Sequence, residues 1–216
     1  MNAEGTDIID GKERVDGYAS KENIESAIVQ IEIWSDPTDQ ILLYIAGDGA
    51  NFFGNHYTLI NYNNGIWDSE LHEWINRWFG GFIGSNYQEY NKMIFIIESC
   101  FSGNALIRNL YGYNRIIITS TNDFNYAGYS RTNGLGFFTE QFFESVNESI
   151  NIRDAFINGV NAVKDIRISH FPMPISQFLY SKAKPLLNDN GDGMGHEFLP
   201  ENEDGKDEGL AHKTYI

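Results

Sequence analysis

The chain of 216 residues is poor in several residue types, and each scarcity excludes a class of protein. A single cysteine rules out a disulfide within the chain. Lys and Arg number 15 against 30 Asp and Glu, and the resulting net charge of −15 argues against binding to the phosphate backbone of nucleic acids. No apolar run approaches the length of a membrane span, and residues 1–4 do not have the pattern of a signal peptide.

The residues that are abundant are those of a globular domain with a substantial core. Hydrophobic residues make up 42% of the chain and aromatic residues 14%. This composition is typical of folded rather than disordered chains, and the length suits one domain of ordinary size. We expect three parts: an N-terminal loop or fragment end over 1–19, a domain over 20–187, and an acidic tail over 188–216, where Asn, Gly, Asp and Glu dominate.

Three short segments have the apolar character of strands buried on both faces of a sheet: Ile41–Ala46, Met93–Ile97, which is apolar throughout, and Arg115–Thr119 with its three central isoleucines. Between and after them, apolar residues recur at helical spacing near residues 24–31, 71–78, 138–146 and 152–160. Alternating strands and helices predict a mostly parallel sheet with helices on both sides, a three-layer αβα fold.

Small and polar residues follow each of the three strands, as Gly47-Asp48-Gly49, Glu98-Ser99-Cys100 and Ser120-Thr121-Asn122. The carboxyl ends of neighbouring parallel strands meet at one edge of a sheet, where ligands commonly bind. We therefore expect Asp48, Cys100 and the loop after Thr119 to line one cleft. A hairpin is predicted over 52–59, with Gly54-Asn55 as its turn.

The sequence resembles the caspase-like cysteine peptidases, and most closely their legumain-type prokaryotic branch. Glu98-Ser99-Cys100-Phe101-Ser102-Gly103 is similar to the nucleophile segment of that family, and residues 116–120 are similar to the strand that follows it. Gly134–Phe143, Asp154-Ala155-Phe156 and Pro185–Glu197 are similar to later segments, so the resemblance covers roughly residues 18–216. It implies a cysteine endopeptidase acting on peptides or proteins and needing no cofactor for catalysis.

The resemblance also implies roles for individual residues. Cys100 stands at the nucleophile position, the amides of Gly49 and Cys100 would stabilise the oxyanion, and Ser120, Thr121 and Asn122 would help to form the substrate pocket. Glu98 stands two residues before the cysteine, where it could support the loop, bind a basic substrate residue, or be a plain carboxylate at a strand end.

The chain departs from the family in two places. Asp48 occupies the position of the general-base histidine, in the middle of Gly47-Asp48-Gly49. In addition, the strand and helix with which the family begins are not found before residue 20, so the N-terminal part of the sheet is either outside this chain or lost.

Asp48 is a poor substitute for a general base. A free carboxyl has a pKa near ~4 and a thiol near ~8.5, so moving the proton from thiol to carboxylate costs about 6 kcal/mol before environment is considered. An ionised Asp48 would also repel a thiolate, and it holds no proton for the leaving amine. His56 is the nearest alternative base, although a histidine in a hairpin is expected to face solvent, and a lone cysteine is ordinarily a small buried apolar residue.

Two functions therefore remain open from the sequence. One is a legumain-type endopeptidase with weak or no activity, because its base is altered. The other is a non-catalytic module of a larger surface protein that binds peptides or proteins through the same cleft. The resemblance makes an extracytoplasmic location plausible, but residues 1–20 carry no export signal.

A calcium loop is predicted near the start of the acidic tail. Asn188, Asn190 and Asp192 place side-chain oxygens at alternate positions, Gly193 is at the sixth position, and Glu197 could complete the ligand set. A solvated turn explains the same residues equally well.

Overall fold

The computed structural model describes residues 8–9, 12–13, 17–36, 38–60, 64–79, 92–128, 136–169, 183–189, 194–196 and 211–216. Its centre is a four-stranded sheet of order β3-β7-β8-β9, formed by β3 (Ile41–Ala46), β7 (Met93–Glu98), β8 (Arg115–Thr119) and β9 (Leu186–Asn188). The first three strands are parallel, and β9 runs antiparallel to β8. The three predicted strands and the mostly parallel sheet are thus confirmed.

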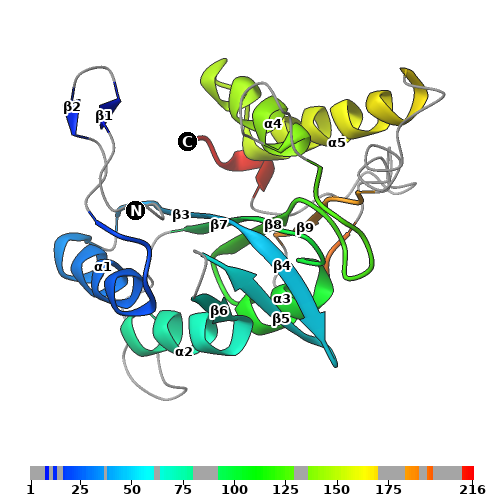
Figure 1. The fold of residues 1–216 in the computed structure, drawn as a ribbon. Helices are drawn as coiled ribbons and strands as arrows, with labels where there is room; N and C mark the ends of the chain where they lie inside the picture. The colour runs from blue at the N-terminus through cyan, green and yellow to red at the C-terminus, as the bar shows by residue number, and fades with distance from the viewer. Residues whose placement is uncertain are drawn as a thin grey trace.

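Helices cover both faces of this sheet (Figure 1). One side carries α1 (Lys21–Trp34), α2 (Asp68–Trp78) and α3 (Asn104–Leu110), and the other carries α4 (Phe137–Asn147) and α5 (Ile152–Ser169). A separate core lies on each side, because alternate strand residues point to opposite faces: Phe95, Ile97 and Ile117 to the first, and Ile94, Ile96, Ile116 and Ile118 to the second. The three-layer αβα fold is confirmed.

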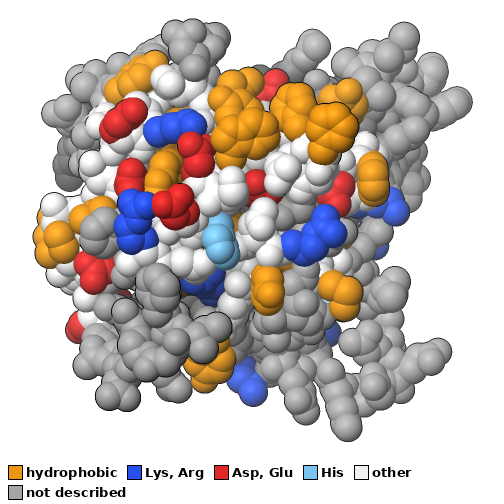
Figure 2. Space-filling model, turned by 90° about the horizontal axis from the view of Figure 1, so that it is seen from below, with side chains coloured by type: hydrophobic (Ala, Val, Ile, Leu, Met, Phe, Trp, Pro, Cys, Tyr) orange, Lys and Arg blue, Asp and Glu red, His pale blue; other side chains and the backbone are white. Residues whose placement is uncertain are grey.

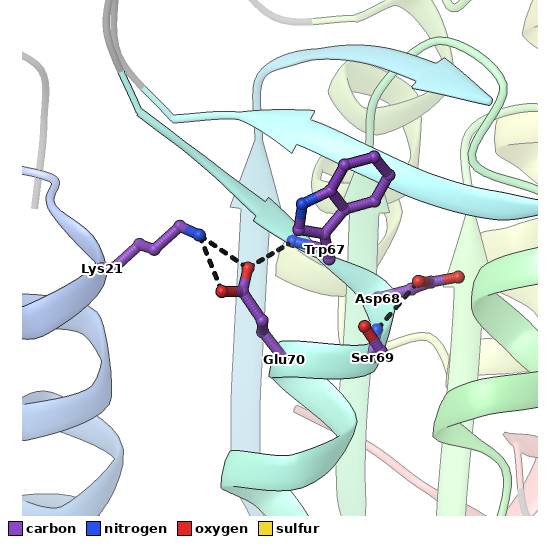
Figure 3. Close-up of polar contacts among 5 residues, drawn as sticks. All are labelled: Lys21, Trp67, Asp68, Ser69 and Glu70. Atoms are coloured by element: carbon purple, nitrogen blue, oxygen red, sulfur yellow. Dashed lines mark hydrogen bonds and ion pairs between the residues drawn. The ribbon is translucent and has the colours of Figure 1, made fainter. Parts of the chain in front are cut away.

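Side-chain hydrogen bonds mark the starts of α1 and α2, whereas α3 and α4 begin without one. The Ser20 side chain accepts a hydrogen bond from the amide of Asn23 at the start of α1. At the start of α2, the Glu70 carboxylate accepts a hydrogen bond from the Trp67 amide at 3.0 Å. The same carboxylate forms an ion pair with Lys21 at 2.7 Å, and this pair connects α1 to α2 (Figure 3). Among the described residues, no helix combines the length and the apolar character that crossing a membrane requires.

A second, antiparallel sheet of order β4-β5-β6 follows β3 and lies beside the carboxyl end of the central sheet: β4 (Asp48–Phe52), β5 (Asn55–Leu59) and β6 (Gly65–Trp67). The predicted hairpin is present, but its turn is Phe53-Gly54 rather than Gly54-Asn55, so the predicted turn was wrong by one residue. A two-residue turn of this kind needs positive φ at both positions, and φ is 51° at Phe53 and 86° at Gly54.

Two further expectations need correction or restatement. Ile41–Ala46 was predicted to be buried on both faces, but Leu42 is 37% exposed and Ala46 is exposed, because β3 is the last strand of the central sheet among the described residues. The short strands β1 (Ile8–Ile9) and β2 (Lys12–Glu13) pair only with each other, and no described residue before Ile41 joins the central sheet.

The predicted boundary at residue 188 divides residues that pack together. Asn188 belongs to β9 and pairs with Ile117, and it is buried. After the segment that lies outside the described residues, η1 (Ala211–Lys213) follows, with Ala211 and Thr214 buried, and the Thr214 carbonyl accepts a hydrogen bond from the amide of Ile152. The described part of the 188–216 segment therefore packs against the domain, and whether it is a separate unit stays a prediction.

Candidate functional site

The ends of three neighbouring strands form the site. The amide of Gly47, after β3, donates a hydrogen bond to the Glu98 carbonyl of β7 at 3.0 Å, and the amide of Ser120, after β8, donates to the Ile97 carbonyl at 3.0 Å. The amide of Phe101 donates to the Asn125 carbonyl at 2.9 Å. The 47–49 turn, the cysteine turn and the loop after β8 thus lie side by side, as the parallel strand ends predicted.

Cys100 lies two residues after the end of β7 and is only 5% exposed. The chain bends sharply after it, because Phe101 has φ of 58°, a left-handed conformation that is uncommon for a bulky residue. Backbone strain of this kind concentrates at functional sites. The Phe101 ring packs on the ring of Tyr126, with centroids 4.8 Å apart, and this contact helps to hold the strained conformation.

Gly49 touches the cysteine turn through its backbone. A side-chain carbon on Gly49 would lie 2.1 Å from the Cys100 carbonyl oxygen and 2.9 Å from the His56 ring, so only glycine fits. This contact holds β4 against the end of β7. It also places the Gly49 amide at the thiol of Cys100.

The Asp48 side chain reaches the same thiol. Its carboxylate is exposed, accepts a hydrogen bond from the Gly49 amide at 2.9 Å, and acts as a hydrogen-bond partner of the Cys100 thiol. Burial raises the pKa of the Cys100 thiol, and the charge and hydrogen bond of Asp48 raise it further. The amides of Ala127 and Gly49 oppose these effects without cancelling them. The cysteine is therefore held as a neutral thiol at neutral pH.

His56 is fully buried, so the expectation that it faces solvent was wrong. Its Nε2 lies 2.9 Å from Oγ1 of Thr58 and 2.9 Å from Oγ of Ser99, and its backbone amide donates to the Asp68 carboxylate at 3.0 Å. Burial lowers the pKa of His56, with smaller opposing effects from Asp68, the Phe101 backbone and Asp123. The imidazole is thus a neutral core group behind the cysteine turn.

Glu98 is also buried, but it faces the other side of the sheet. The Tyr44 hydroxyl donates a hydrogen bond to its Oε2, and a side-chain carbon on Gly136 would lie 1.8 Å from its Oε1. Within the described residues, Oε1 has no hydrogen-bond partner. Glu98 therefore supports the segment before α4, and no described contact joins it to Cys100.

The three residues predicted to bind substrate have different surroundings. Ser120 lines a small cavity together with Gly128, Gly136 and Phe138, and its hydroxyl has no hydrogen-bond partner among the described residues. Thr121 is buried, and its carbonyl accepts hydrogen bonds from the hydroxyls of Thr119 and Ser102. The Asn122 side chain accepts hydrogen bonds from Phe124 and Asn125 and so shapes the loop. Ser120 is therefore the one of the three that lines this cavity.

The predicted calcium loop is described only at its start. Asn188 donates a hydrogen bond to the Met194 carbonyl, whereas Asn190, Asp192 and Glu197 lie outside the described residues. Within the described ranges, no group of three His, Cys, Asp or Glu side chains is placed to hold a metal ion. Calcium binding stays a prediction, as does catalysis without a cofactor.

Several residues of the site were missed from the sequence. Thr58 follows His56 by two positions on the same strand, so period-2 alternation could have placed both side chains on one face. Ser99 lies directly before Cys100 and was given no role, although its hydroxyl contacts His56. Ala127 contributes only a backbone amide, for which the sequence carries no signal.

Comparison with solved structures identifies the fold. The chain superposes on caspase-1 from Spodoptera frugiperda with a TM-score of 0.53 and 16% identity, covering 79% of this chain and 68% of that one. The fold is caspase-like. A protein from Geobacter sulfurreducens shows similar agreement, with a TM-score of 0.52 and 13% identity over 79% of this chain and 73% of that one. No family model and no curated protein sequence matches the chain.

The chain shares its fold with these two solved structures. At these identities the likeness concerns the fold alone, and it does not extend to the roles of individual residues. What the site can do must therefore be argued from the geometry around Cys100.

Proposed function

We propose that this protein is a legumain-type cysteine peptidase homologue in which Cys100 occupies the nucleophile position and Asp48 the position of the general base. Peptide hydrolysis by this chain is weak or absent for that reason. The observation that carries the proposal is the Asp48 carboxylate at the Cys100 thiol, which acts with burial to raise the pKa of that thiol.

The chemistry of hydrolysis explains why this pair is ineffective. The attacking species is a thiolate, and the same base that accepts the thiol proton must later protonate the leaving amine. An ionised carboxylate at Asp48 opposes the thiolate by like-charge repulsion and carries no proton to deliver. The remaining machinery is compatible with acyl transfer, because the Gly49 amide lies at the thiol, where an oxyanion donor is needed.

A second candidate is a peptide- or protein-binding module that does not cleave what it binds. The observation in its favour concerns His56, a histidine that packs against the cysteine turn: its Nε2 is already in contact with the hydroxyls of Ser99 and Thr58. Because this imidazole is buried and its pKa is lowered, it does not take over the role of the missing base.

The titration of the thiol tests the proposal directly. Cys100 is the only cysteine, so the rate of alkylation by iodoacetamide as a function of pH reports on it alone. We expect slow alkylation at pH 7 and a midpoint above that of an ordinary thiol. Asp48→Asn should shift the midpoint downward, because it removes the charge and leaves the burial.

The expected result has a clear opposite. Rapid alkylation at pH 7, with a midpoint at or below that of a free thiol, would mean that the site activates Cys100, and the proposal of an impaired peptidase would be wrong. Urea-unfolded protein supplies the reference, because its thiol has the ordinary pKa of about 8.5.

A further inference from the structure

The outer face of the small sheet carries a cluster of aromatic rings. The ring centroids of Phe52 and Trp67 are 5.8 Å apart, and those of Tyr57 and Trp67 are 4.7 Å apart. Phe52 is 50% exposed, and the other two are half-buried. Because side chains alternate along a strand, these rings point away from the face on which His56 and Thr58 are buried.

Among the described residues that share this face through the strand register, Asp48 is the charged one. Cross-strand register places the following residues on this face: Asp48, Ala50, Phe52, Asn55, Tyr57, Leu59 and Trp67. Lys21 pairs with Glu70, and Figure 3 shows the Trp67 indole pointing away from that pair. Seen from below, large hydrophobic groups lie toward the upper part of the view, and others are spread among charged side chains (Figure 2).

Ala50 is the smallest side chain on this face of β4. It lies between Asp48 and Phe52 on β4, and its cross-strand partner is Tyr57. Among the described residues, β4 is the last strand of its sheet, so no strand pairs with its outer edge. A long side chain arriving from that edge would cross the methyl group of Ala50 and meet the Tyr57 ring, with the Asp48 carboxylate on one side.

We propose that the outer edge of β4 accepts an extended peptide and that a Lys or Arg side chain of that peptide lies over Ala50, between Asp48 and Phe52. An apolar stem suits the methyl group and the Phe52 ring, and a cationic head suits a ring face beside a carboxylate. Addition of a strand to an exposed sheet edge is a common mode of peptide recognition.

Two further observations support a basic peptide as the occupant. The net charge of the chain is −15, which attracts cationic partners over a distance. In addition, β4 begins at Asp48 and Gly49, which contact Cys100, so a peptide on β4 would lead directly into the candidate site. The inference extends the proposed function by naming the chemistry of the partner, and in that sense rests on it.

Peptide binding to the Cys100→Ala protein tests the inference without any cleavage. The probes are three fluorescein-labelled decapeptides of alternating serine with lysine, norleucine or glutamate, measured by fluorescence anisotropy at 0.15 M salt. We expect the lysine peptide to bind at least fivefold more tightly than the norleucine peptide, which has the same stem without the charge. The glutamate peptide should bind most weakly.

Two variants locate the binding site without changing the net charge. Ala50→Ile places a bulky side chain where the lysine stem would lie, and Phe52→Ala removes an exposed ring. Each variant should therefore weaken lysine-peptide binding at least fivefold. Tyr113→Ala is the matched control, because Tyr113 is 77% exposed and precedes β8 at the opposite end of the central sheet. It should bind like the parent protein.

The inference is overturned by equal binding of the lysine and norleucine peptides, by undiminished binding to both Ala50→Ile and Phe52→Ala, or by no binding of the lysine peptide. Phe52→Ala keeps the test valid if Ala50→Ile does not fold. Because the thiol titration above uses no peptide, failure here and failure of the proposed function are separate results.

Discussion

The imidazole of His56 packs against the cysteine turn, with its Nε2 2.9 Å from Oγ of Ser99, the residue before Cys100. Hydrogen bonds of this imidazole link β5 to the end of β7, and the Gly49 backbone contacts the same turn from β4. Both β4 and β5 of the small sheet thus contact the turn that carries Cys100.

Removal of the His56 ring should destabilise the protein strongly. His56→Ala leaves a cavity beneath the turn and removes the hydrogen bonds to Ser99 and Thr58, so we expect a loss of about 2–4 kcal/mol in the free energy of unfolding. Urea unfolding monitored by tryptophan fluorescence measures this value. An effect below about 1 kcal/mol would contradict the supporting role.

Stability should fall on mild acidification because of the same residue. Burial lowers the pKa of His56 in the folded state, whereas the unfolded value is near ~6.5. Below pH ~6.5 the unfolded chain therefore binds a proton that the folded chain resists, and stability decreases as pH falls, by at most about 1.4 kcal/mol per pH unit. His56→Gln should flatten this limb of the stability profile, and an unchanged profile would show that other groups cause it.

Gly49 should not tolerate a side chain. Gly49→Ala places a carbon 2.1 Å from the Cys100 carbonyl oxygen, a contact with backbone that cannot give way cheaply, so we expect a loss above about 2 kcal/mol. Gly17→Ala is the control, since its nearest neighbour would be an ordinary 3.7 Å away. Thermal unfolding followed by circular dichroism compares the two, and equal melting temperatures would contradict the close approach.

The Tyr44 hydroxyl should matter for the buried carboxyl group of Glu98. Tyr44→Phe removes the donor to Oε2, and a buried carboxyl oxygen without that donor costs about 1–3 kcal/mol. Tyr113→Phe serves as the control at an exposed tyrosine. Equal stability of the two variants would mean that the hydrogen bond contributes nothing.

Much of the fold could be predicted from sequence, because its strands are short apolar runs that stand out against polar surroundings. The bounds of β3 and β8 were predicted correctly, and β7 extends one residue further, to Glu98. The juxtaposition of Asp48, Cys100 and the loop after Thr119 followed from the parallel sheet alone. Tertiary contacts decided the rest: His56 is polar and lies near a turn, yet it is buried in the core, where its Nε2 contacts Ser99 and Thr58.

The turn of the hairpin shows a similar limit. Gly54-Asn55 has the composition of a turn, but the pairing of Phe52 with Asn55 puts Phe53 into a left-handed conformation instead. Residue preferences alone would not place phenylalanine there, and register set by the whole small sheet overrides them.

Peptide hydrolysis should be compared among three proteins: the unaltered chain, Asp48→His, and Asp48→His combined with Cys100→Ala. A mixed peptide library read by mass spectrometry avoids any assumption about specificity. We expect only Asp48→His to cleave, because an imidazole at position 48 can take the thiol proton and return it to the leaving amine. Cleavage by the unaltered chain at a rate equal to that of Asp48→His would show that Asp48 does not impair the site.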